Sequence, residues 1–144
     1  MDISDLVTQD NSEKGVWFQA EVYGKKQPFD ICILGADSDK VVLYKREIEK
    51  EAQKLVGTLF GKKQEEEQEL ETAEDIRNKN INDAVVRMNG LRSRDKEPLV
   101  LQGVELKSDE ASYRLICEKI PDLISFVVEK SNKRANFLGG RKNA

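Results

Sequence analysis

The stretch that decides the fold is Val16-Trp-Phe-Gln-Ala-Glu-Val22, followed after a polar segment by Phe29-Asp-Ile-Cys-Ile33. Apolar and polar residues alternate in both, and this period of two is typical of a β-strand with one buried face. The intervening Gly24-Lys-Lys-Gln-Pro28 is short and contains glycine, so we expect a β-hairpin. Because an isolated hairpin is marginal in water, its apolar face needs a cover.

A long amphipathic helix is expected directly after the hairpin. Asp37 or Ser38 can cap it, since either side chain can accept a hydrogen bond from a free backbone amide of the first turn. The helix should run for roughly 20 residues, with charged residues on its remaining faces. Its apolar stripe consists of Val41, Tyr44, Ile48, Ala52, Leu55 and Leu59. We expect this helix to cover the hairpin.

The second half of the chain is predicted to be mostly helical. An amphipathic stretch from Ala73 to Met88 ends at the stop signal Asn89-Gly90. The segment 99–106 is extended, either as a third strand or as a bent arm. Two more helices follow, one capped by Ser108 and one that starts at Pro121. The predicted fold class is α+β, with an N-terminal β-hairpin packed by amphipathic helices and a helical C-terminal part.

The 144 residues are expected to form one domain. Residues 1–12 are polar and aperiodic, and we predict a flexible N-terminal arm there. Residues 13–138 form a single α+β domain, interrupted at about 62–75 by a polar, acidic connection. Residues 139–144 are predicted to be a flexible tail.

Composition argues against enzymes that depend on histidine. The chain has no histidine, which excludes Ser-His-Asp and Cys-His nucleophile pairs and zinc sites that use histidine. Cys32 and Cys117 lie in apolar runs and are expected to be buried and reduced. No run approaches the roughly 18 apolar residues of a membrane helix, and the amino end lacks the features of a signal peptide. We therefore expect a cytoplasmic protein.

Two segments suggest a phosphate-binding loop and a carboxylate site, but neither has the residues or the surroundings that such a site needs. Gly57-Thr-Leu-Phe-Gly61-Lys-Lys63 has one residue too few for a phosphate loop, and lysine stands where such a loop needs a hydroxyl. The carboxylates of the acidic connection have almost no apolar neighbours, so they are expected to be hydrated. We predict no catalytic residue, no metal ligand, no cofactor and no enzymatic activity.

The carboxyl-terminal third carries a more specific pattern. It reads Gly103-Val-Glu-Leu-Lys-Ser108, Tyr113-Arg-Leu115, Ile120-Pro-Asp-Leu-Ile124 and Asn132-Lys-Arg-Ala-Asn-Phe-Leu138. This pattern, with the tryptophan-bearing strand and Leu34-Gly-Ala-Asp-Ser38 before a charged helix, resembles tail assembly chaperones of long-tailed (siphovirus-like) bacteriophages and prophages.

The resemblance implies a non-enzymatic function in the host bacterial cytoplasm. Such chaperones bind tape-measure protein, keep it soluble, help to recruit tail-tube protein, and are absent from the mature virion. A structural protein of the phage tail or head–tail connection is the alternative, because it would have a similar composition. Self-association through exposed strand edges also stays open.

The last helix and the residues after it are the predicted partner-binding surface. An apolar stripe there passes into basic residues and then into an aromatic residue. The candidate residues are Phe126, Lys130, Arg134, Asn136 and Phe137. Five bases from Lys130 onward, without an acid, leave nucleic acid in view, but the net charge of −3 argues against such a partner.

Overall fold

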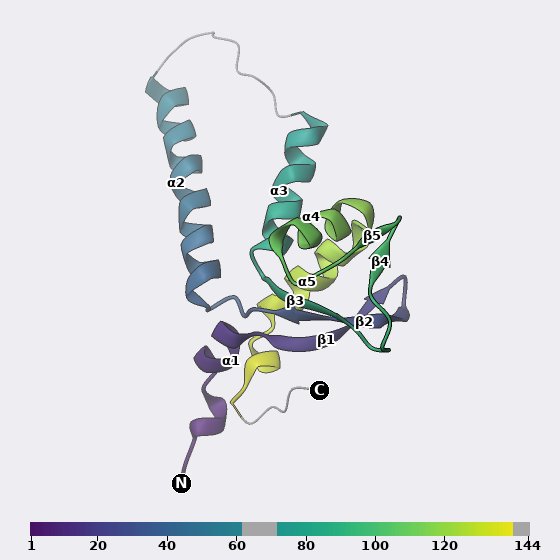
Figure 1. Cartoon of the computed structure of the whole chain (residues 1–144). Coiled ribbons are helices and arrows are strands. Elements are labelled where there is room, and N and C mark those ends of the chain that lie inside the picture. The colour runs from purple at the N-terminus through teal and green to yellow at the C-terminus, as the bar shows by residue number, and fades with distance from the viewer. Residues whose placement is uncertain (62–71, 140–144) are drawn as a thin grey trace.

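The structure is a computed structural model that describes residues 1–61 and 72–139. Figure 1 shows a small sheet with a group of helices on one side of it and one long helix that stands apart. The predicted α+β fold class is confirmed. In chain order the elements are η1 Ser4–Leu6, α1 Gln9–Lys14, β1 Val16–Val22, β2 Lys25–Ile33, α2 Asp39–Gly61, α3 Ala73–Val85, β3 Met88–Ser93, β4 Val100–Leu101, β5 Val104–Glu105, α4 Glu110–Lys119, α5 Asp122–Asn132 and η2 Arg134–Phe137.

The predicted hairpin is confirmed. β1 and β2 pair antiparallel, with Phe18 opposite Ile31. The turn consists of Tyr23 and Gly24, whose φ angles are both positive, at 56° and 75°. A two-residue turn of this kind matches the twist of the flanking strands. The turn is therefore shorter than expected, and residues 25–28 belong to β2.

The third strand of the sheet is β3, which pairs with β2 in the order β1-β2-β3. The sequence placed a helix stop at Asn89-Gly90, and this prediction is wrong because α3 ends at Val85. Gly90 serves the strand instead: a Cβ there would lie 2.6 Å from Cη2 of Trp17, so a side chain would collide with the indole. The segment 99–106 is extended as expected, but it folds on itself as the separate hairpin β4–β5.

The core lies on one face of the sheet. The apolar side chains buried there from β1 and β2 are Val16, Phe18, Ala20, Val22, Phe29, Ile31 and Ile33. Helix α5 lies against β1 and β2 and buries Leu123 and Val127 completely, while α3 and α4 pack against α5 and against each other.

Helix α2 begins and runs as the sequence predicts, but it does not cover the sheet. The cover is α5 (Figure 1). The physical reason lies in composition, because every residue from Leu123 to Val128 except Ser125 is apolar, whereas α2 carries charges on most of its surface. The more apolar helix gains more free energy from burial on the sheet.

The prediction of a flexible arm over residues 1–12 is wrong for its last part. Residues 9–14 form α1, and Ser12 is fully buried. The Asp37 carboxylate accepts hydrogen bonds from the hydroxyls of Ser12 and Thr8, the latter at 2.7 Å. Small hydroxyl side chains thus hold α1 against the start of α2, a contact that hydrophobic periodicity cannot reveal.

Most of the acidic connection, residues 62–71, lies outside the described residues, as do residues 140–144 of the predicted tail. The end of the connection is described and helical. The Thr72 hydroxyl accepts a hydrogen bond from the Asp75 amide at 3.1 Å, and the Asp75 carboxylate accepts one from the Thr72 amide at 3.2 Å. This reciprocal capping box fixes the start of α3.

Candidate partner-binding surface

Phe137, the aromatic residue at the centre of the predicted partner surface, lies in the core. Only 1% of the residue is exposed. Its ring meets that of Phe18 edge-on, with centroids 6.4 Å apart. In this conformation Phe137 cannot contact a partner, so its assignment as a surface residue is corrected. The short helix η2 turns the ring inward, and the sequence pattern did not reveal that turn.

The structure does bring most of the other predicted residues together, but around this internal contact. The Lys130 ammonium lies 5.7 Å from the ring centroid of Phe18 and 5.5 Å from that of Phe126. Asn136 donates its side-chain amide to the Lys130 carbonyl oxygen at 3.1 Å. Arg134 is exposed. These contacts connect α5 and η2 to the sheet.

Helix α2 offers a more open surface. Its first turn is fixed, because Val41 is fully buried and donates its amide to the Ser38 hydroxyl at 3.4 Å. The Tyr44 hydroxyl donates to the Asp83 carboxylate of α3 at 2.6 Å. Apolar side chains around and beyond this point face solvent: the exposed fraction is 49% for Val42, 62% for Leu43 and 41% for Ile48.

The hydrogen bond between Tyr44 and Asp83 lies in a partly buried, charged environment. Burial, together with the hydrogen bond to Asp83, raises the pKa of Tyr44 well above its usual value. Arg87 lies beside this pair; it is 4% exposed and donates to the Asp83 backbone oxygen at 2.5 Å. Burial lowers the Arg87 pKa. The first turns of α2 are thus held by Val41 and Tyr44, whereas the described side chains of residues 45–54 form no hydrogen bond or ion pair with another element.

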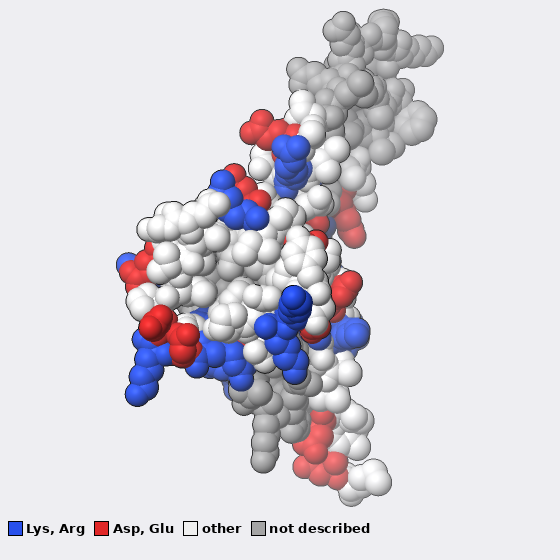
Figure 2. Space-filling model, turned by 90° about the vertical axis from the view of Figure 1, so that its right-hand side faces the viewer, with Lys and Arg blue, Asp and Glu red and all other residues white. Residues whose placement is uncertain are grey.

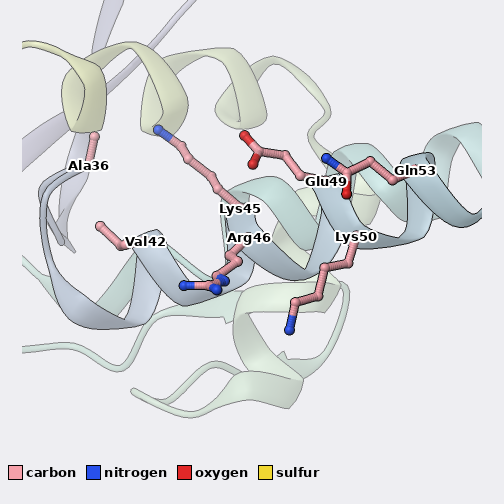
Figure 3. Close-up of a pocket in the computed structure, with 7 residues that line it drawn as sticks. All are labelled: Ala36, Val42, Lys45, Arg46, Glu49, Lys50 and Gln53. Carbon is pink, nitrogen blue, oxygen red and sulfur yellow. The ribbon is translucent and has the colours of Figure 1, made fainter.

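A groove of about 600 Å³ runs along one flank of α2. Ala36 and Val42 form its apolar end, and the side chains of Lys45, Arg46, Glu49, Lys50 and Gln53 line the rest. Figure 3 shows these side chains spreading from the helix, with Lys45 and Glu49 to one side and Arg46 and Lys50 to the other. The sequence assigned the apolar stripe of this helix to the core and therefore missed the surface. The signal that was available is Val42 with Leu43, two apolar residues outside the predicted stripe, of which Val42 lines the groove.

The acidic and cysteine side chains of the described residues bear on two kinds of site, a metal centre and a reactive thiol. No group of three or more acidic or cysteine side chains within residues 1–61 and 72–139 could hold a metal ion. Burial raises the pKa of Cys32 to about 11 and that of Cys117 to about 12, so both thiols stay protonated at neutral pH. In the same part of the chain, no helix is long and apolar enough to cross a membrane.

Charge is mixed on the face shown in Figure 2. Lys and Arg side chains gather on the lower part of the globular body, with acidic side chains beside them. A nucleic-acid surface would need a continuous basic stripe. Comparison with protein families, with curated proteins and with solved structures finds no match for this chain.

Proposed function

We propose that this chain is a non-enzymatic tail assembly chaperone of a long-tailed phage or prophage, which binds tape-measure protein and helps to recruit tail-tube subunits. The resemblance in the carboxyl-terminal third supports the family. The observation that carries the proposal is α2, a helix of 23 residues whose aliphatic side chains Val42, Leu43 and Ile48 face solvent. The protein acts in the host cytoplasm and leaves before the virion is complete.

The physical basis is the marginal stability of a helix that has little tertiary packing. Helices in proteins are stabilised mainly by burial of an apolar face, and α2, which is about 35 Å long, is held near its start by Val41 and Tyr44. A partner helix with its own apolar stripe would bury both surfaces at once. Such shelter is what a long amphipathic client requires before it is enclosed.

Co-expression with the tape-measure protein of the same phage tests this function. We expect the wild-type chain to keep that protein in the soluble fraction. The double variant Leu43→Asp/Ile48→Asp should lower the yield of complex by about tenfold. Burial of two aliphatic side chains at the interface contributes enough binding free energy to change the affinity by at least about tenfold. The matched control is Val100→Asp/Val104→Asp, which alters two valines of similar exposure on β4 and β5.

Two results would contradict the proposal. One is a tape-measure protein that stays insoluble with the wild-type chain present. The other comes from mass spectrometry of purified virions: stoichiometric amounts of the chain in mature particles would identify a structural protein of the tail or head–tail connection.

A further inference from the structure

The groove along α2 is positively charged, although the chain as a whole is negatively charged. Three cationic side chains line it, Lys45, Arg46 and Lys50, against the single carboxylate of Glu49. The whole chain, in contrast, carries a net charge of −3. The groove is therefore a local cationic surface on an anionic protein.

These cations are free to bind a partner. Among the residues that the structure describes, neither Lys45 nor Arg46 forms an ion pair. Lys50 lies 3.8 Å from Glu47, and this pair is solvent-exposed on both sides. Exposed pairs of this geometry contribute little, so a carboxylate from a partner can replace Glu47 at small cost.

The apolar end of the groove restricts the partners that fit it to those with an apolar group beside their negative charges. Val42 is half-exposed there beside Ala36, so the occupant must present an aliphatic side chain next to its carboxylates. Phosphate backbones and acidic disordered tails lack that combination. An amphipathic helix provides it, because residues three and four apart put an apolar stripe beside a charged flank.

We propose that the groove on α2 binds a client helix whose apolar stripe is flanked by acidic residues, with aliphatic side chains against Val42 and carboxylates against Lys45, Arg46 and Lys50. This inference rests on the proposed function and specifies the chemistry of its client. It predicts that recognition depends on charge as well as on apolar burial.

Two synthetic peptides of about 18 residues test this inference without any phage component. Both carry the same leucine stripe, but one has Glu and the other Lys along the flanks. Fluorescence anisotropy of labelled peptide should show the Glu peptide binding about tenfold more tightly at low salt, an advantage that shrinks as salt screens the charges. The net charge of the chain favours the Lys peptide, so nonspecific attraction cannot produce this result.

Charge reversal in the groove tests whether its cationic side chains cause the preference for the Glu peptide. Lys45→Glu/Arg46→Glu should reverse the preference toward the Lys peptide, whereas Lys25→Glu/Lys96→Glu, with the same change in net charge at exposed sites on β2 and in the loop after β3, should keep it. Equal binding of both peptides by the wild-type chain would overturn the inference, as would an unchanged preference in the groove variant. Self-association that excludes the Glu peptide would assign the groove to a second copy and also overturn it.

These outcomes separate the two proposals. If the wild-type chain dissolves tape-measure protein but does not distinguish the peptides, the function stands and the acidic client helix is wrong. If the Glu peptide is preferred but tape-measure protein stays insoluble, the groove binds acidic helices of a different partner and the proposed function is wrong.

Discussion

Phe137, in the short helix η2 after α5, is a fully buried residue of the core. Its ring is buried against that of Phe18, and the Lys130 ammonium lies 5.7 Å from the centroid of the Phe18 ring. A buried aromatic ring of this size fills a large volume, and its loss leaves a cavity that the surrounding side chains close only in part. Phe137 therefore matters for the stability of the fold.

We expect Phe137→Ala to lower the free energy of unfolding by about 3 kcal/mol, the usual cost of removing a buried aromatic ring. Urea denaturation followed by circular dichroism measures this directly. Lys96→Glu is the control, and this substitution at an exposed site in the loop after β3 should change stability by less than about 0.5 kcal/mol. A Phe137→Ala protein as stable as wild type would show that the ring is not buried in solution.

Among the elements, α1 is held against the segment before α2 by side-chain hydrogen bonds that centre on one carboxylate, Asp37. Asp37 binds the hydroxyls of Thr8 and Ser12, and the Glu13 carboxylate accepts the Asp39 amide at 2.6 Å. Partial burial alone would raise the pKa of Asp37, but the hydroxyl donors outweigh it and lower the pKa below 3.8. A carboxylate with a lowered pKa stabilises the folded form above the unfolded pKa, and this contribution disappears as the pH falls through the folded value.

The attachment of α1 should therefore weaken in acid. Protection of the α1 amides against hydrogen exchange, corrected for intrinsic rates, should be constant near neutral pH and fall as the pH drops below about 4. In Asp37→Asn the protection at neutral pH should be lower, and the part of the acid response that comes from residue 37 should disappear. If wild type and variant respond identically to acid, Asp37 does not hold α1.

The sequence predicted those elements whose identity depends on local periodicity. The alternation in Val16–Val22 predicted β1, and the stripe after Ser38 predicted α2 with nearly its observed start. The prediction was wrong where one residue type is compatible with two different structures. Gly90 is compatible with a helix end and with a strand position under an indole, and only the contact with Trp17 decides between them.

Periodicity also shows which face of a helix is apolar without showing what that face contacts. Helices α2 and α5 both have apolar stripes, and the sequence order suggested that α2 packs on the sheet. Burial of Leu123 and Val127 on α5 shows otherwise. The same ambiguity explains why the sequence assigned the buried ring of Phe137 to a partner surface and the exposed side chain of Ile48 to the core.

For the whole molecule, the structure separates a packed body from an extended helix. The body contains the sheet with α3, α4 and α5, and α2 leaves it after Tyr44 (Figure 1). Exposed aliphatic side chains and cationic groups occur together on that helix. The proposed chaperone function assigns the body to stability and α2 to the client.

Hydrogen exchange of the chain, alone and in complex with tape-measure protein, tests this assignment most directly. We predict that the amides after Tyr44 in α2 exchange quickly in the free chain and are protected at least about tenfold in the complex, since burial of the helix suppresses its local opening. Protection confined to the sheet, or to α4 and α5, with α2 unchanged, would contradict the account.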